Sequence, residues 1–251
     1  MNKHLIVLGL SVALLSSSCS ESDFNSAMKS AGDMAGEYQK GQGGNALSES
    51  TIGRGLKEAL EQGVGKGVDI LSARNGFWSD MARRILLPPE AQKVEKTLRD
   101  LGLGNLVDKC LLDINHAAED AATGARPIFV QAITSMSFTD AKNILLGGNK
   151  SAATEYLQRT TSNALYDSFK PVIFQSLNKV GALNTYKDVI TKYNSIPLVQ
   201  KVNPDLADHV TKKAMEALFV MVNKEEQNIR VNPVARITQL LKTVFAAQDK
   251  R

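Results

Sequence analysis

The stretch NLVDKCLLDINHAAEDAATGA, Asn105–Ala125, decides the fold class. Its apolar residues recur at steps of three and four, which places them on one face of a helix at about 100° per residue. Arg126-Pro127 ends the stretch, because a proline disfavours helical backbone in the residue before it. The apolar face consists of Val107, Cys110, Leu111, Ile114, Ala118, Ala121 and Ala125. This spacing predicts a long amphipathic helix with one face in a core.

Helical spacing continues on both sides of that stretch. An upstream helix is predicted to begin near Ser48 and to end before a turn at Asn75-Gly76. No segment alternates apolar and polar residues between hairpin turns, as a strand would. Further helices are predicted at Glu90–Leu101, Pro127–Met136, Thr139–Leu146, Ser151–Val180 with a kink at Pro171, Thr185–Tyr193, Asp205–Arg230 opened by Pro204, and Pro233–Gln248 capped by Asn232. The sequence therefore predicts an all-α fold, with a single multi-helix domain after a signal peptide and a flexible tether.

The first residues are typical of an export signal that ends in a lipid-attachment site. Lys3 and His4 give a short polar start, Leu5–Leu15 is an apolar run interrupted only by Ser11, and three serines precede Cys19. The run is too short to cross a bilayer as a helix. The pattern resembles a bacterial lipoprotein signal. We therefore expect a lipoprotein signal peptide at 1–18, a flexible tether at 19–47 acylated on Cys19, and an all-helical domain at 48–251.

The location of the protein follows from this signal. Ser20, rather than Asp, follows Cys19, and by resemblance to lipoprotein sorting rules this favours the outer membrane, facing the periplasm. The alternative is ordinary secretory cleavage after Ser18 or Ser20, since Ser16 stands where the usual signal has Leu. Cys19 could then pair with Cys110.

Charge and hydropathy narrow the set of partners. The chain has 30 Lys and Arg against 26 Asp and Glu. The basic residues form no run and do not interleave with aromatics, so we expect no nucleic-acid partner. No later segment is apolar over the length that crosses a membrane, so membrane contact is expected to come from the N-terminal lipid anchor.

Two helices carry polar residues at or beside apolar positions. In 105–126, a stripe along the edge of the apolar face consists of Asp108, Asn115, Glu119 and Arg126, so Glu119 is expected to be partly buried. In 205–230, Glu225 falls among apolar neighbours and should point inward, where a carboxylate needs a basic partner. Arg126 and Arg236 are the predicted partners.

Glu226 and Arg230 are spaced as an ordinary exposed helix pair. The polar residues allow two interpretations, a structural network or the polar floor of a ligand pocket. The candidate set is Asn115, Glu119, Arg126, Glu225, Arg230 and Arg236.

Familiar catalytic motifs are missing from the sequence. The glycines near Lys66 do not fit a phosphate-binding loop, because Gly67 follows the lysine where Ser or Thr is required. Close helix packing explains them better. His116 and Glu119 have a spacing that could share a metal, but no second histidine motif accompanies them. We predict no metal site and no cofactor.

Several motifs together resemble a family of exported bacterial proteins called domain of unknown function 4197. The similarity covers about Thr51 to Ala246. The resemblance implies an exported helical domain with no established activity, so it assigns no catalytic residue. The motifs are Asn115-His116-Ala117-Ala118-Glu119, Ala125-Arg126-Pro127-Ile128-Phe129, Asp140-Ala141, Ile144-Leu145-Leu146-Gly147, Ala152-Ala153-Thr154, Glu225-Glu226, Ile229-Arg230 and Asn232-Pro233.

These observations favour a lipid-anchored cell-envelope protein that works as a non-catalytic binding or scaffold module. Its partner would be an envelope protein or a small amphipathic ligand held between helices. The alternative is an uncharacterised, hydrolase-like enzyme that uses Glu119 and Glu225 as paired carboxylates. Such a pair must lie within about 10 Å of each other beside an open cleft.

Overall fold

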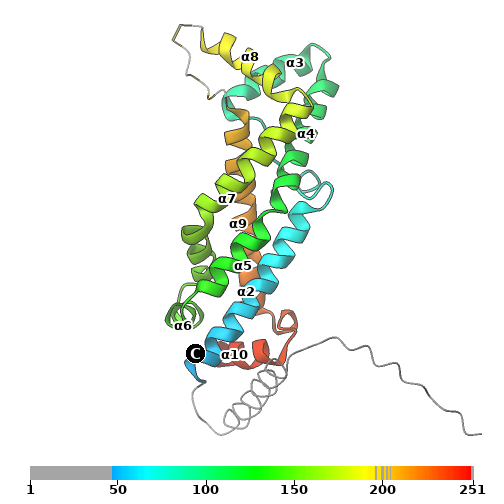
Figure 1. Cartoon of the computed structure of the whole chain (residues 1–251). Coiled ribbons are helices and arrows are strands. Elements are labelled where there is room, and N and C mark those ends of the chain that lie inside the picture. Colours follow the sequence, from blue (N-terminus) through cyan, green and yellow to red (C-terminus); the bar gives the residue numbers. More distant parts are fainter. Residues whose placement is uncertain (1–46, 196, 199–200, 202, 204, 250–251) are drawn as a thin grey trace, which may run out of the picture. The chain divides into compact units, whose positions relative to one another are not determined.

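The structure, a computed structural model, describes residues 47–195, 197–198, 201, 203 and 205–249. The predicted signal peptide, Cys19 and the tether up to residue 46 lie outside the described residues, as does Pro204. Every regular element in the described part is a helix, as Figure 1 shows. The predicted all-α fold is confirmed.

In chain order the helices are α2 (Glu49–Ser72), the 3₁₀ helix η1 (Pro89–Ala91), α3 (Gln92–Asp100), α4 (Gly104–Ala122), α5 (Ala125–Ser135), α6 (Phe138–Leu146), α7 (Ala152–Lys179), α8 (Ala182–Asn194), α9 (Leu206–Val231), the 3₁₀ helix η2 (Pro233–Ala235) and α10 (Gln239–Asp249). A long connection of residues 73–88 follows the first helix, and residues 195–205 separate α8 from α9. Helix α7 continues through Pro171.

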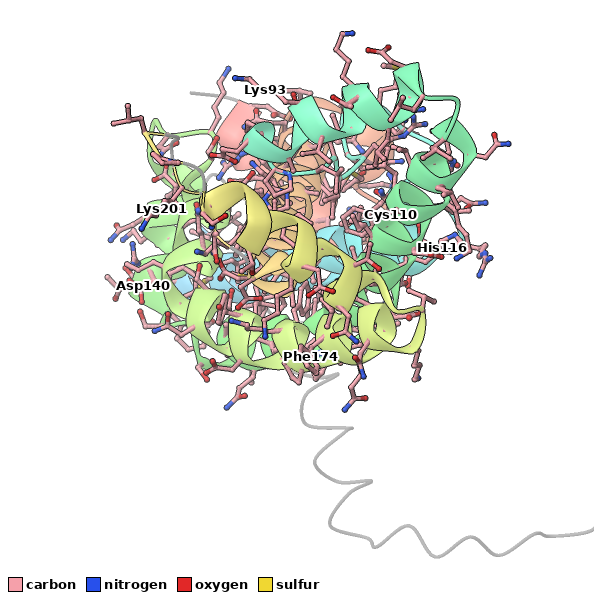
Figure 2. All side chains as sticks on the ribbon, turned by 90° about the horizontal axis from the view of Figure 1, so that it is seen from above. Lys93, Cys110, His116, Asp140, Phe174 and Lys201 are labelled. Carbon is pink, nitrogen blue, oxygen red and sulfur yellow. The ribbon has the colours of Figure 1, made fainter. Side chains whose placement is uncertain are left out.

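The long helices pack side by side around a common core. Helix α9 contacts α2, α4 and α7, and α5 packs on α2 and α7. Helices α3 and α8 lie at one end of this bundle, while α6 and α10 lie at the end where α2 begins (Figure 1). Polar side chains such as Lys93 and Asp140 project outward (Figure 2). Phe77, Phe129, Phe169 and Phe245 are fully buried and come from four different segments, which ties the bundle together.

The glycines of α2 permit close approach of neighbouring helices. A Cβ atom added to Gly55 would lie 2.6 Å from Cγ2 of Val244 on α10, closer than any real contact. Helix α10 can therefore lie against the backbone of α2 only at a residue without a side chain. This confirms close helix packing as the role of the glycine at this position.

The last predicted helix, Pro233–Gln248, is wrong in its first part. Asn232 does act as a cap, since its Oδ1 accepts a hydrogen bond from the backbone N–H of Val234. However, the helix stops after η2 and α10 begins only at Gln239. The side chain of Arg236 turns back to donate to carbonyl groups at the end of α9, and Thr238 Oγ1 accepts from the N–H of Leu241 at the start of α10. These contacts favour two separate elements over one continuous helix.

Candidate functional site

Asn115 on α4 fixes the loop of residues 73–88, which we call the 73–88 loop. The side chain is fully buried. Its Oδ1 accepts a hydrogen bond from the N–H of Ile85 at 2.8 Å, and its Nδ2 donates to the carbonyl oxygen of Ile85 at 2.9 Å. A buried loop backbone needs such partners because no neighbouring strand or helix satisfies it. Asn115 therefore substitutes for a strand partner at this point.

Glu119, one turn further along α4, holds the other side of the same loop. Its carboxylate accepts hydrogen bonds from the N–H groups of Asn75 at 3.1 Å and Phe77 at 3.3 Å. His116 Nε2 lies 3.1 Å from Asn75 Oδ1. Asn75 has a φ of 61°, so the predicted turn is confirmed. Glu119 is 5% exposed, which confirms its predicted burial.

Glu225 points inward as predicted, but its predicted partners are wrong. It is 6% exposed, and its Oε2 lies 2.9 Å from the Nζ of Lys66 on α2. Arg126 instead lies across α2, where it donates to the carbonyl oxygen of Gly65 and pairs with Asp69. A Cβ atom on Gly65 would lie 2.9 Å from Nη1 of Arg126, so the absence of a side chain at Gly65 leaves room for the guanidinium. The sequence pattern around Arg126 carries no signal for that direction.

Arg126 and Lys66 border an open groove of about 600 Å³ on the exposed side of α2, which we call the α2 groove. The side chains of Lys66, Asp69 and Arg126 are 53%, 70% and 47% exposed. The groove is therefore wet and carries charges of both signs. Its lining is Glu61, Gln62, Gly65, Lys66, Asp69, Ile70, Ala73 and Arg126.

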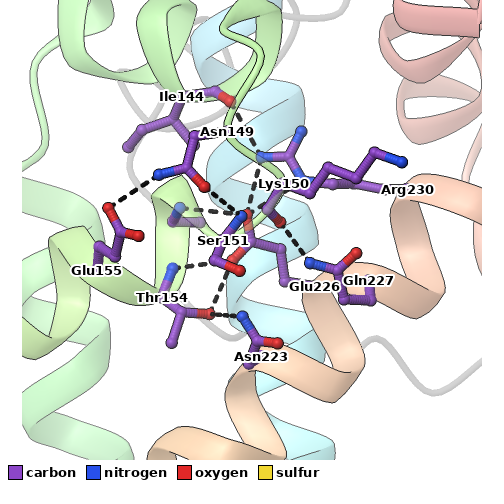
Figure 3. Close-up of polar contacts among 11 residues, drawn as sticks. Ile144, Asn149, Lys150, Ser151, Thr154, Glu155, Asn223, Glu226, Gln227 and Arg230 are labelled. Atoms are coloured by element: carbon purple, nitrogen blue, oxygen red, sulfur yellow. Dashed lines mark hydrogen bonds and ion pairs between the residues drawn. The ribbon is translucent and has the colours of Figure 1, made fainter.

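The predicted exposure of the Glu226–Arg230 pair is wrong. The two side chains are 4% and 3% exposed and lie 2.8 Å apart. The carboxylate of Glu226 also accepts hydrogen bonds from the first turn of α7 (Figure 3). The donors are the N–H groups of Ala153 and Thr154 and the Thr154 hydroxyl. Arg230 donates to the carbonyl oxygen of Ile144 at the end of α6.

A helix N-terminus explains why this pair is buried. The first N–H groups of α7 have no partner within their own helix, and the helix dipole favours a negative charge beside them. Glu226 supplies both the acceptor and the charge. Its neighbour Arg230 compensates that charge inside the protein. The pair thus joins α6, α7 and α9.

Arg236 satisfies free backbone carbonyl groups at the end of α9, as Glu226 satisfies free N–H groups at the start of α7. It is 3% exposed and donates to the carbonyl oxygens of Ile229 and Arg230 at 3.0 and 2.7 Å. Both of its terminal nitrogens also bind the carboxylate of Asp249, and the hydrogen bonds from Arg236 lower the pKa of Asp249 below its ordinary value. Its predicted pairing with Glu225 is therefore wrong.

The six candidate residues do not form one polar cluster. Glu225 Cβ lies beside Gly63, whereas the carboxylate of Glu119 binds amides beyond the end of α2 at Ser72. Gly63 and Ser72 are roughly 14 Å apart along the helix, at about 1.5 Å per residue. The structure therefore places Glu119 and Glu225 in different environments and gives no support to paired-carboxylate chemistry.

Asp208 at the start of α9 is a buried polar residue whose burial the sequence pattern does not predict. Its carboxylate accepts hydrogen bonds from the Tyr166 hydroxyl at 2.7 Å and from Lys212 at 2.9 Å. Burial alone would raise the pKa of Asp208, but the hydrogen bonds from Lys212 and Tyr166 outweigh it and the pKa is lowered. The only sequence signal is the Asp208–Lys212 spacing, which many exposed pairs share.

A cavity lined by residues of α2, α7, α9 and α10 is small and mostly apolar. Its volume is about 20 Å³, and Leu56, Val222 and Phe245 are among its lining residues. In the described part of the chain, no three His, Cys, Asp or Glu side chains gather so that they could hold a metal ion. No described helix is both long enough and apolar enough to span a membrane.

The described part of the chain is an all-helical domain. Each of the six candidate polar residues forms hydrogen bonds or ion pairs with other residues of the domain. Arg126 also borders the open, charged α2 groove. The chain belongs to the family described as "Protein of unknown function (DUF4197)", which matches residues 46–246. The resemblance inferred from the sequence motifs is thereby confirmed. No curated protein and no solved structure matches the chain significantly.

Proposed function

We propose that the protein is a lipid-anchored component of the cell envelope, and that its helical domain is a non-catalytic module that binds a partner protein in the α2 groove. The anchor is the acylated Cys19 in the outer membrane, facing the periplasm. The polar start, apolar run and small residues before Cys19 support the anchor. The groove supports the binding role.

The contrast between groove and cavity favours a protein over a small amphipathic ligand. Pockets for drug-sized ligands have volumes of about 300–1,000 Å³ and are mostly apolar. The mostly apolar cavity of about 20 Å³ is far smaller than that. The α2 groove of about 600 Å³ has the volume, but it is open and bordered by charged side chains. Such a surface suits the side chains of another protein.

The charges of the groove can contribute to recognition. Asp69 and Arg126 are 70% and 47% exposed, so exchanging this pair for charges of another protein loses little, because exposed ion pairs contribute only about 0–1 kcal/mol. Opposite charges across an interface speed association and fix its register. Ile70 and Ala73 supply apolar contact within the same groove.

The hydrogen bonds of the carboxylates argue against the hydrolase-like alternative. A general base must be free to reach the proton that it removes. Both oxygens of Glu119 and both oxygens of Glu226 accept backbone N–H groups, and Glu225 is paired with Lys66. These contacts stabilise helix ends and a loop, which is a structural use of the charge.

Site-specific photo-crosslinking in cells tests the binding role. A photoreactive amino acid replaces Ile70 in the groove or, as control, the 51% exposed Phe174 on the outer side of α7 (Figure 2). We expect one crosslinked protein from position 70 and none from position 174. Asp69→Lys, at a groove position that is 70% exposed, should weaken the crosslink. Equal products from both positions would contradict a specific groove.

A further inference from the structure

We infer that the turn between α9 and α10, residues 231–237, inserts into the membrane surface to which the protein is anchored. We call it the α9–α10 turn. The inference rests on the proposed lipid anchor and goes beyond it, because the sequence assigns all membrane contact to the acyl chains. The partner of this surface is lipid.

Three branched aliphatic side chains project from this turn into solvent. Val231, Val234 and Ile237 are 67%, 85% and 69% exposed. Isolated exposed aliphatics are common, but three within one short turn form a concentration of apolar surface that needs a partner. β-Branched side chains are stiff, so they lose little freedom when they insert.

The turn is held rigidly in a conformation that keeps these side chains outside. Asn232 caps η2 at Val234, and Gln62 Nε2 donates to the carbonyl oxygen of Ala235 at 3.0 Å. Arg236 is buried and binds the carbonyl groups of Ile229 and Arg230. With the backbone fixed at these points, Val234 and Ile237 cannot fold back into the core. Their exposure is therefore built into the fold.

The position of the turn identifies lipid as its partner. The turn and α10 lie toward the end of the bundle where α2 begins (Figure 1), and Gln62, which contacts the turn, is about 20 Å along α2 from its first residue, at about 1.5 Å per residue. The chain enters α2 from residues 20–47, which lead back to Cys19. The flexible tether that the sequence predicts for this segment would have a root-mean-square span of about 30 Å. The anchor thus keeps the turn near the bilayer, where even a weak second contact is favoured.

The opposite end of the bundle provides a matched control. Leu101 and Leu106, at the α3–α4 corner, are 70% and 62% exposed. They resemble the α9–α10 turn in apolar exposure but are far from the entry of the chain into α2 (Figure 1). Exposure alone would predict lipid contact at both ends. We expect lipid contact at the α9–α10 turn and none at the α3–α4 corner.

Tryptophan quenching in reconstituted vesicles separates these outcomes. Full-length acylated protein carrying Val234→Trp or Leu101→Trp is placed in phosphatidylethanolamine–phosphatidylglycerol vesicles, with or without brominated acyl chains. The native Trp78, the single tryptophan of the chain, gives the background signal. We expect brominated lipid to quench the Val234→Trp emission about twofold, because interfacial side chains reach roughly 5–10 Å into the acyl boundary. Leu101→Trp should match the background.

Flotation of the same vesicles and the intact mass of the protein distinguish failure of the inference from failure of the anchor. If the acylated protein floats and Val234→Trp is not quenched, or is quenched no more than Leu101→Trp, the membrane-inserting turn is wrong and the anchor stands. If Cys19 is unmodified and the protein does not float, the anchor itself is wrong. Adding Ile237→Asp should reduce the quenching of Val234→Trp while flotation persists, and unchanged quenching would overturn the inference.

Discussion

Glu226 shows how strongly one residue can depend on contacts that are distant in sequence. Its spacing from Arg230 is that of a surface pair, yet its carboxylate lies against the first turn of α7. Sequence periodicity shows which residues share a face of one helix. It does not show which other helix packs against that face. The same limitation applies to Arg126, which binds the carbonyl oxygen of Gly65 and the carboxylate of Asp69 on α2.

Removing the charge of Glu226 should destabilise the protein severely. Glu226→Gln leaves the buried Arg230 without a counter-charge, and breaking a buried pair in this way costs about 3–5 kcal/mol. Urea denaturation at neutral pH measures the change in the free energy of unfolding. Glu216→Gln is the control, because Glu216 is 61% exposed and its pair with Lys213 should contribute only about 0.2–1 kcal/mol. Equal losses in both variants would contradict the structural role of the buried pair.

Asp208 should contribute to stability above about pH 4 and lose that contribution in acid. Its pKa in the folded protein lies below the ordinary value of 3.8, so the unfolded chain takes up a proton first as the pH falls. The contribution is complete above the unfolded pKa and disappears as the pH falls through the folded pKa. Between pH 5 and 3, the unfolding free energy of Asp208→Asn should therefore fall less steeply than that of the wild type. Parallel curves would show that Asp208 does not cause the dependence.

At the level of elements, two glycines of α2 should respond in opposite ways to substitution by alanine: one change should lower the stability of the protein and the other should raise it. Gly55→Ala places a methyl group 2.6 Å from Val244 and should cost about 1–3 kcal/mol through overpacking. Gly67→Ala meets Met221 at 3.5 Å, an ordinary contact, and should stabilise the helix by up to about 1 kcal/mol. Thermal unfolding of the two variants measures both effects. A loss at Gly67 equal to that at Gly55 would contradict the packing described for α10.

The 73–88 loop should loosen when its anchor on α4 is removed. Asn115→Ala leaves the N–H and carbonyl groups of Ile85 without their partner, at a cost of about 1–3 kcal/mol. Hydrogen exchange should accelerate at Ile85 and its neighbours while α7 remains protected. Lys109→Ala, on the same helix in an exposed pair with Asp113, serves as control. Unchanged exchange at Ile85 would mean that the loop is held by other contacts.

The helices themselves were largely predictable, because periodicity and capping signals are local. Ser137 accepts from the N–H of Asp140 at the start of α6, as its place before the helix predicts. The inward directions of Glu119 and Glu225 also followed from periodicity. Their partners did not, because Lys66, Asn75 and Phe77 come from a segment whose packing is set by tertiary contacts.

At the scale of the whole molecule, the buried polar groups and the exposed surfaces have separate roles. Glu119, Glu226 and Arg236 bind helix ends and loops, which fixes the bundle. The α2 groove and the α9–α10 turn remain open to solvent. In the proposed arrangement the turn meets lipid and the groove meets a protein.

The intact mass of the protein purified from its native membrane tests the central claim most directly. A lipid-anchored module should begin at Cys19 and carry acyl groups on that residue. Apart from any bound protein, its mass should be the same under native and denaturing conditions. An unmodified Cys19, or a small molecule that leaves on denaturation, would contradict a lipid-anchored module that binds a partner protein.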